Sequence, residues 1–210
     1  MKSLNQQFRY KSLLFLFLLG LIWSCKTDSK ATRVEIDNQY VTAIKKDQII
    51  LESGDVFDLP VTDSSFVYYL VRHAEKDTLP KDNPRLTEQG YERAAKLYDM
   101  LKGTRIDAIY STFYMRTMET VDSLADAKGM KIFPYTPQGF KELHKNIVEN
   151  SEYRRILVSG HSNTTPVVAN YLYDKNHFQS SFDDKDYDNF LIVVDNGPEE
   201  KSLFSLKFKP

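Results

Sequence analysis

Short apolar runs of strand length alternate along the chain with stretches whose apolar residues recur at i, i+3, i+4 and i+7. The runs predict buried strands, and the helical spacing predicts amphipathic helices. The expected strands are Phe66–Val71, Ile106–Tyr110, Lys131–Tyr135 and Arg155–Ser159. The expected helices lie around Tyr91–Leu101, Thr117–Leu124, Phe140–Ile147 and Pro166–Leu172. This alternation predicts an α/β fold, a three-layer sandwich with a largely parallel central sheet.

The two ends of this pattern carry antiparallel features. In residues 34–60, two β-prone runs flank the polar Lys45–Asp47, which predicts a small N-terminal β-hairpin extension. Near the C-terminus, Phe190–Val194 and Leu203–Phe208 are joined through Asn196-Gly197, a dipeptide typical of hairpin turns. We therefore expect the sheet to end in a C-terminal hairpin.

The beginning of the chain has the pattern of an export signal. Lys2, Arg9 and Lys11 precede an unbroken apolar run, Leu13–Trp23, as the basic and apolar regions of a secretory signal do. The run is too short for a good membrane-spanning helix, which needs about 20 apolar residues. Cys25 is the only cysteine in the chain, so the mature protein is expected to form no internal disulfide.

The sequence around Cys25, Ile22-Trp23-Ser24-Cys25, resembles a bacterial lipobox, in which the cysteine is lipidated and becomes the first mature residue. The resemblance implies a lipoprotein signal peptide over residues 1–24 and a lipid anchor at Cys25, with the protein exported to the periplasmic or outer surface of a bacterial membrane. Residues 25–33 are small and polar and suit a tether. An ordinary cleaved signal, or an uncleaved anchor with an incidental cysteine, is the alternative. Residues 61–210 are the expected main domain.

The net charge of the chain excludes some classes of partner. A formal net charge of -1 produces no long-range field that would gather nucleic acid or an anionic membrane surface. We expect no nucleic-acid partner. Any site for an anion must therefore be local and built from a few positioned cations. Oligomeric state cannot be inferred from the sequence.

The candidate catalytic and ligand-binding residues follow the expected strands. Ligands of open α/β sheets bind beyond the carboxyl ends of the strands, so the residues after each strand matter. Arg72 and His73 follow the first expected strand, and Arg116 comes shortly after the second. His161 follows the fourth. Two histidines and two arginines are thus expected at one edge of the sheet.

This set favours phosphate over a metal. The planar fork of arginine binds phosphate oxygens in a bidentate manner, and a neutral imidazole can accept a phosphoryl group as a nucleophile. The four histidines, His73, His144, His161 and His177, show no paired ligand spacing. Arginines beside two of them would also repel a cation. We therefore expect no metal and no other cofactor.

Four ordered blocks resemble the histidine phosphatase superfamily, whose fold is that of phosphoglycerate mutase. The blocks cover about residues 66–172 and are Leu70–Lys76, Leu86–Gly90 with Arg93-Ala94, Tyr110–Thr112 with Arg116-Thr117, and Ser159–Thr164. The resemblance implies that His73 is phosphorylated and that Arg72 and Arg116 clamp the phosphoryl oxygens. It further implies that His161 stabilises the transition state. The expected substrate-binding residues around this pocket are Ser111, Asn163 and Thr164; as strand-end and helix-cap residues they have an equally good structural interpretation.

The chain departs from the family at the general acid. Relatives commonly place Glu or Asp after the third strand, whereas this chain has Thr136 after Tyr135. Glu142, on the following helix, is the tentative substitute, although a solvated helix charge is the simpler interpretation. Without an acid, poor leaving groups should react slowly, because leaving-group protonation contributes about 10²–10⁴-fold.

The function expected from the sequence is therefore hydrolysis of a phosphomonoester, or a similar small phosphorylated compound, through a phosphohistidine on His73. Two alternatives stay open. One is a non-catalytic lipoprotein that binds a phosphorylated ligand. The other is a phosphatase of phosphohistidine proteins, which export away from the cytoplasm disfavours.

Overall fold

The computed structural model describes residues 36–210. The predicted signal segment 1–24, the tether 25–33 and the lipidation site Cys25 lie outside the described residues, so export and lipidation stay predictions. Within residues 36–210, no helix combines the length and the apolar character needed to cross a membrane.

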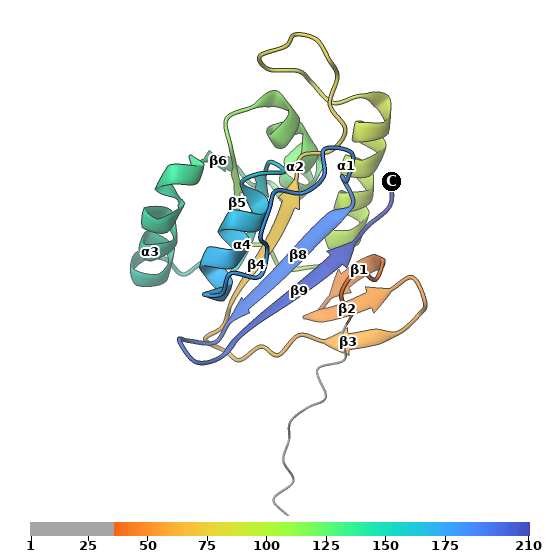
Figure 1. The fold of residues 1–210 in the computed structure, drawn as a ribbon. Coiled ribbons are helices and arrows are strands. Elements are labelled where there is room, and N and C mark those ends of the chain that lie inside the picture. The colour runs from red at the N-terminus through yellow and green to blue at the C-terminus, as the bar shows by residue number, and fades with distance from the viewer. Residues whose placement is uncertain (1–35) are drawn as a thin grey trace, which may run out of the picture. The chain divides into compact units, whose positions relative to one another are not determined.

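A six-stranded sheet in the order β6-β5-β7-β4-β8-β9 forms the centre of the described chain (Figure 1). The strands are β4 (Phe66–Arg72), β5 (Ala108–Ser111), β6 (Ile132–Pro134), β7 (Arg155–Gly160), β8 (Asn189–Asp195) and β9 (Lys201–Lys207). The pairs among β6, β5, β7 and β4 are parallel, and β8 and β9 add an antiparallel hairpin at one edge. Parallel neighbours have their carboxyl ends at the same edge, which is the geometry that a shared site needs.

Helices cover both faces of the sheet (Figure 1). They are α1 (Glu88–Leu101), α2 (Met115–Lys128), α3 (Phe140–Asn150) and α4 (Thr165–Tyr173), with a 3₁₀ turn, η1 (Pro137–Gly139), before α3. Because successive strand side chains point to opposite faces, alternate residues of β4 enter different cores. Tyr69 packs with residues of α1 and α2, and Tyr68 packs with residues of α3 and α4. The predicted three-layer sandwich is confirmed.

The N-terminal extension is a three-stranded antiparallel sheet of β1 (Val41–Lys45), β2 (Gln48–Leu51) and β3 (Val56–Asp58). The sequence predicted its first two strands, and β3 completes it. Ile44 and Ile49 are fully buried and belong to the same apolar cluster as α1 and the main sheet. The hydroxyl of Thr104 also donates to the carbonyl of Ile44 at 2.5 Å. Residues 36–60 therefore share the core of the main sheet.

Candidate functional site

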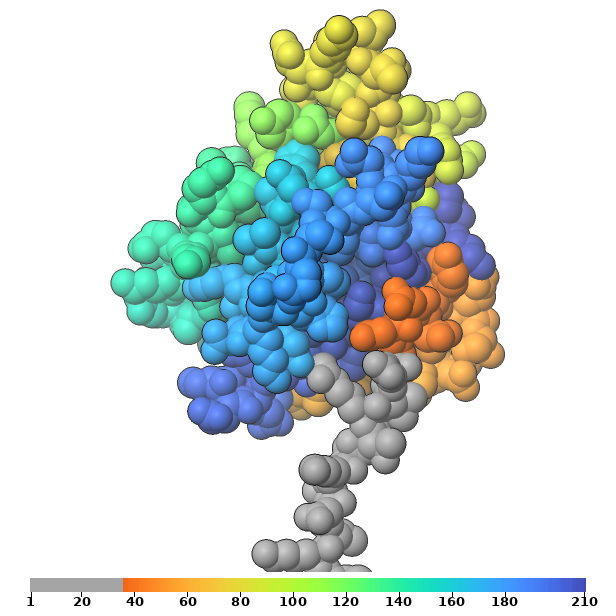
Figure 2. All heavy atoms as spheres, in the orientation of Figure 1, coloured from red at the N-terminus to blue at the C-terminus, as the bar shows by residue number. Residues whose placement is uncertain are grey.

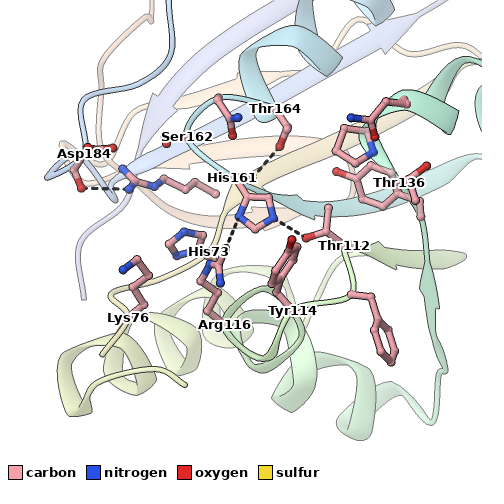
Figure 3. Close-up of a pocket in the computed structure, with 16 residues that line it drawn as sticks. His73, Lys76, Thr112, Tyr114, Arg116, Thr136, His161, Ser162, Thr164 and Asp184 are labelled. Carbon is pink, nitrogen blue, oxygen red and sulfur yellow. Dashed lines mark hydrogen bonds between the residues drawn. The ribbon is translucent and has the colours of Figure 1, made fainter. Parts of the chain in front are cut away.

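A pocket of about 740 Å³ lies at the carboxyl ends of β4, β5 and β7, the edge at which the sequence placed its candidate residues. Residues from four strand ends and from the segment before β8 line it (Figure 3). Figure 2 shows the loop between β4 and α1, coloured yellow, projecting from this end of the structure. The predicted residues found in the pocket wall are Arg72, His73, Arg116, His161, Asn163 and Thr164.

His73 is held in one orientation directly after β4. Its backbone N–H donates to the carbonyl of Gly160 at 2.9 Å, which ties it to the end of β7. Its ring nitrogen Nδ1 lies 2.8 Å from the carbonyl oxygen of Ala74. A carbonyl can only accept, so Nδ1 carries the proton and Nε2 keeps its lone pair. The ring is buried, with 4% of the residue exposed.

Arg72 is oriented by backbone carbonyls of the segment before β8. Its Nη1 donates to the carbonyls of Asp183 at 2.7 Å and Asp186 at 3.0 Å, and its Nη2 donates to the carbonyl of Asp184 at 3.0 Å. The ring of Tyr187 stacks 4.2 Å from the guanidinium carbon and also neighbours the His73 ring. Three of the five N–H groups of Arg72 are thus used to fix the side chain.

Arg116 and His161 complete the group from α2 and from the end of β7. The Nη2 of Arg116 lies 3.4 Å from Nδ1 of His161, and its guanidinium stacks on Tyr114 at 4.4 Å. The rings of His73 and His161 have centroids 5.5 Å apart. Figure 3 shows His73, Arg116 and His161 facing one another across the pocket.

A short hydroxyl chain fixes the His161 ring. Nε2 of His161 lies 2.9 Å from the hydroxyl of Thr112, which donates its own proton to the hydroxyl of Thr117 at 3.0 Å. The Thr117 hydroxyl in turn donates to the backbone carbonyl of Thr112 at 2.7 Å. Thr112 must therefore accept from His161, so Nε2 carries the ring proton and Nδ1 faces Arg116.

The charges of the pocket are unbalanced. Among residues 36–210, neither Arg72 nor Arg116 forms an ion pair with a carboxylate, and the Nε–H group of each is buried without a hydrogen-bond partner. Burial lowers the pKa of both guanidinium groups, yet arginine stays charged at all ordinary pH values. The carboxylates of Asp183, Asp184 and Asp186 lie near Arg72 without forming an ion pair with it. Two guanidinium groups whose buried Nε–H groups are unpaired favour an anionic ligand.

The same environment keeps the two histidines neutral. Burial, together with smaller effects of Arg72, His161 and Arg116, lowers the pKa of His73 to about 3, although the hydrogen bond to the Ala74 carbonyl raises it in part. Burial and the charges of Arg116 and Arg72 lower the pKa of His161 to about 4. Neutral rings are what a nucleophile and a hydrogen-bonding partner of phosphate require near pH 7.

The loop that carries His73 is fixed from the opposite side by Arg93 of α1. Arg93 is 3% exposed and forms ion pairs with Glu75 at 2.7 Å and Asp188 at 2.8 Å. The loop after β4 also packs closely against α1 at Gly90. A Cβ on Gly90 would lie 2.2 Å from the carbonyl oxygen of Glu75, so only glycine allows this contact. The segments on both sides of the pocket, after β4 and before β8, are thus anchored to one helix.

Two residues expected at the site do not line it. Glu142 is exposed and lies at a separate hollow beside His144 and Tyr171, because the helical phase of α3 directs Phe140 and Ile147, not Glu142, inward. Ser111 is 1% exposed, and its hydroxyl donates to the carbonyl of Thr112 at 2.9 Å, so it stabilises the end of β5.

Several lining residues were missed by the sequence reasoning. Within the quoted motifs, Lys76 and Thr112 could have been read as pocket residues, since both lie within four residues of a strand end. Tyr135 and Asp184 also line the pocket, and Tyr187 contacts Arg72 and His73. Asp184 and Tyr187 lie in a segment with no sequence pattern that marks it as part of a site.

The donor set of the described residues does not suggest a metal. Within residues 36–210, no three His, Cys, Asp or Glu side chains are grouped so that they could hold a metal ion. The two guanidinium charges beside His73 and His161 would oppose a cation in any case.

A family model for the histidine phosphatase superfamily (branch 1) matches residues 68–159. This segment runs from β4 to β7 and contains Arg72, His73 and Arg116; His161 follows two residues after it. A search of curated proteins found no match.

Solved structures with the same fold cover most of the described chain. A putative alpha-ribazole-5'-P phosphatase from Escherichia coli str. K-12 substr. MG1655 is similar with a TM-score of 0.54 at 14% identity, covering 68% of this chain and 96% of that chain. The alpha-ribazole phosphatase from Shigella flexneri gives 0.55 at 14% identity, covering 68% and 96%.

A mycobacterial glucosyl-3-phosphoglycerate phosphatase gives a TM-score of 0.54 at 9% identity, covering 69% of this chain and 100% of that chain. At such low identities these likenesses show the fold alone. Residues 68–159 are thus similar to the histidine phosphatase superfamily, and the solved structures add a shared fold.

Proposed function

We propose that the protein is a metal-independent phosphatase that hydrolyses a phosphomonoester, or a similar small phosphorylated compound, through a phosphohistidine on His73. One observation carries the proposal. The Nε2 lone pair of a neutral, buried His73 lies in a pocket with the buried guanidinium of Arg72 and the half-buried guanidinium of Arg116. Neither guanidinium forms an ion pair with a carboxylate in the described chain. The solved phosphatases with the same fold are consistent with this activity.

The reaction would proceed in two steps. His73 Nε2 attacks phosphorus, the N–P bond forms, and the bond to the leaving oxygen breaks. Arg72 and Arg116 neutralise the charge that spreads over the equatorial oxygens, and the protein holds these groups in place before substrate binds. Water then attacks the phosphohistidine, which releases inorganic phosphate and returns His73 to its neutral form.

The hydrogen bond made by Nδ1 of His73 supports both steps of the proposed reaction. While Nδ1–H donates to the Ala74 carbonyl at 2.8 Å, Nε2 is the ring nitrogen left to react. The same hydrogen bond stabilises the positive charge that the ring gains when Nε2 is phosphorylated. The arrangement therefore directs the phosphoryl group to one nitrogen.

Replacement of the nucleophile tests the proposal. We expect His73→Ala to abolish hydrolysis of p-nitrophenyl phosphate while orthovanadate, a phosphate analogue, still binds. His177→Ala, at an exposed histidine outside the pocket, is the matched control and should keep wild-type turnover. Full activity in the His73 variant would refute the mechanism.

A second candidate function is a non-catalytic binder of phosphorylated ligands. It is favoured by the position after β6, where the chain has Thr136 in place of a carboxylate and where Glu142 does not line the pocket. Turnover separates the two candidates: a binder would retain orthovanadate but hydrolyse no phosphate ester at a rate that depends on His73.

For the location, we propose a lipoprotein anchored through Cys25 at a bacterial membrane, periplasmic or outer-surface. The basic, apolar and cysteine-ended sequence over residues 1–25 supports it. Cys25→Ser should release the protein from the membrane fraction of expressing cells. Retention of the variant in that fraction would point to an uncleaved anchor.

A further inference from the structure

The turn between β5 and α2 places an exposed apolar surface at the pocket. Phe113, Tyr114 and Met115 are consecutive in the chain, and 77%, 41% and 37% of these residues, respectively, are exposed. Phe113 and Tyr114 line the pocket. A single exposed apolar side chain needs no explanation, but adjoining ones at a cavity are typical of a surface that a ligand covers.

Hydrogen bonds hold this turn in one position. The N–H of Tyr114 donates to the carbonyl of Thr112 at 2.8 Å, and the N–H of Met115 donates to the side-chain oxygen of Asn83 at 2.8 Å. The hydroxyl of Thr112 lies 2.9 Å from Nε2 of His161. Phe113 thus directly follows a residue in contact with His161, and the backbone sets its position relative to that histidine.

The charged and the uncharged residues of the pocket lie at different strand ends. The charged lining residues come from β4 and the loop after it, from α2 and from the segment before β8, and they are Arg72, Lys76, Arg116 and Asp184. The lining residues of the β5–α2 and β6–α3 connections are uncharged, and they are Thr112, Phe113, Tyr114, Tyr135, Thr136, Pro137 and Gln138. β5 and β6 lie on one side of β7 in the sheet, and β4 and β8 lie on the other. Figure 3 shows Thr136 on the far side of His161 from Lys76 and Asp184.

This division of charge indicates where the two parts of a phosphate ester fit. Arg72, Arg116 and His73 hold the phosphoryl group at the charged end. The pocket has a volume of about 740 Å³, which is the size of a site for a whole small ligand. The organic group of the ester therefore extends to the uncharged end. A second anionic group placed there would lose its hydration without meeting a cation.

We propose that Phe113 is a specificity-determining residue, for a phosphate ester whose organic group is uncharged and carries an aromatic ring. The inference rests on the proposed phosphatase function. The ring of the organic group packs on the exposed side chain of Phe113, which removes apolar surface of both rings from water. Thr136, Pro137 and Gln138 line the same end of the pocket and present no charge to that ring.

Binding of phosphonates, which are not hydrolysed, tests this inference apart from the chemistry of the leaving group. Benzylphosphonate and ethylphosphonate have the same head group, and only the first has a ring. In titration calorimetry we expect the wild type to bind benzylphosphonate about tenfold more tightly than ethylphosphonate. Phe113→Ala should abolish that preference and leave the dissociation constant of ethylphosphonate unchanged. Phe113→Tyr keeps the ring and should keep the preference.

Phe133→Ala is the matched control, because this phenylalanine of β6 is also partly exposed but does not line the pocket. Its two dissociation constants should equal those of the wild type. A preference that survives Phe113→Ala, or that the wild type lacks, would overturn the inference. Tighter binding of para-carboxybenzylphosphonate than of benzylphosphonate would overturn it as well, because the organic group would then meet a cation such as Lys76. Failure of the proposed function looks different: there, His73→Ala keeps its activity on p-nitrophenyl phosphate.

Discussion

At the scale of single residues, the site depends on histidines that stay neutral because they are buried. The pKa of His73 falls to about 3 and that of His161 to about 4, against about 6.5 in an unfolded chain. Between these values the unfolded state binds protons that the folded state does not. Stability is therefore complete above pH 6.5 and falls as the pH drops toward 4.

We predict that the unfolding free energy of His73→Gln falls less at acid pH than that of the wild type. His73 should contribute a loss of about 1–2 kcal/mol of unfolding free energy between pH 6.5 and pH 5. Urea unfolding at the two pH values measures the loss for both proteins. An unchanged pH dependence in the variant would mean that folding does not lower the pKa of His73.

Arg72 illustrates why its residue type cannot be exchanged for another cation. Three of its N–H groups donate to carbonyls of residues 183–186, and a lysine ammonium cannot copy that planar fork. We expect Arg72→Lys to lower kcat about 10²–10³-fold, as loss of a positioned transition-state donor does. Arg105→Lys, at an exposed position, should have wild-type kinetics; similar losses in both would indicate a general charge effect.

The motif residues could be predicted from the sequence, but their partners could not. Arg72, His73, Arg116 and His161 follow strands, and strand ends are readable from apolar runs. The partners of Arg72 are backbone carbonyls of residues 183–186, which the fold brings to the pocket from a segment distant in the sequence. Glu142 lies off the apolar face of α3, as its spacing from Phe140 and Ile147 predicts, and that exposed side of the helix does not line the pocket.

At the scale of elements, α1 fixes the loops on both sides of the pocket. Arg93 links Glu75, two residues after His73, to Asp188, directly after Tyr187. A buried cation with two carboxylate partners cannot lose its charge without leaving both carboxylates unpaired. The helix is therefore part of the site, although none of its residues lines the pocket.

We predict that Arg93→Met lowers the free energy of unfolding by about 3–5 kcal/mol and also lowers kcat, because both loops lose their anchor. Lys102→Met removes an exposed ion pair at the C-terminal end of α1 and should leave stability and turnover unchanged, since exposed pairs contribute little. Denaturant unfolding together with steady-state kinetics measures both. Full turnover in a destabilised Arg93 variant would show that α1 stabilises the fold but is not needed for activity.

Helices and strands were predicted best where the period of the apolar residues and the length of the run indicate the same element. The strands of the parallel part and all four helices were expected within a few residues of where they lie. The sequence did not indicate β3, a strand of three residues, because so short a run carries no readable alternation. The segment 183–187 had no pattern either, since it acts through backbone carbonyls that any residue supplies.

At the scale of the whole molecule, residues 36–60 are integrated into the main core. Ile44→Ala should cost about 2–5 kcal/mol, as the loss of a fully buried aliphatic side chain does, and unfolding should stay a single transition. Val56→Ala, at a half-exposed position of the same small sheet, should change stability by no more than about 0.5 kcal/mol. Two separate transitions would show that the extension folds independently.

The central claim is that His73 accepts the phosphoryl group. The most direct measurement is mass spectrometric mapping of the protein quenched with base during turnover of p-nitrophenyl phosphate. We predict an acid-labile phosphate on His73, absent from His73→Ala and present at a lower level after Arg72→Lys. Rapid turnover with no phosphate on His73, or with phosphate on another residue, would contradict the account.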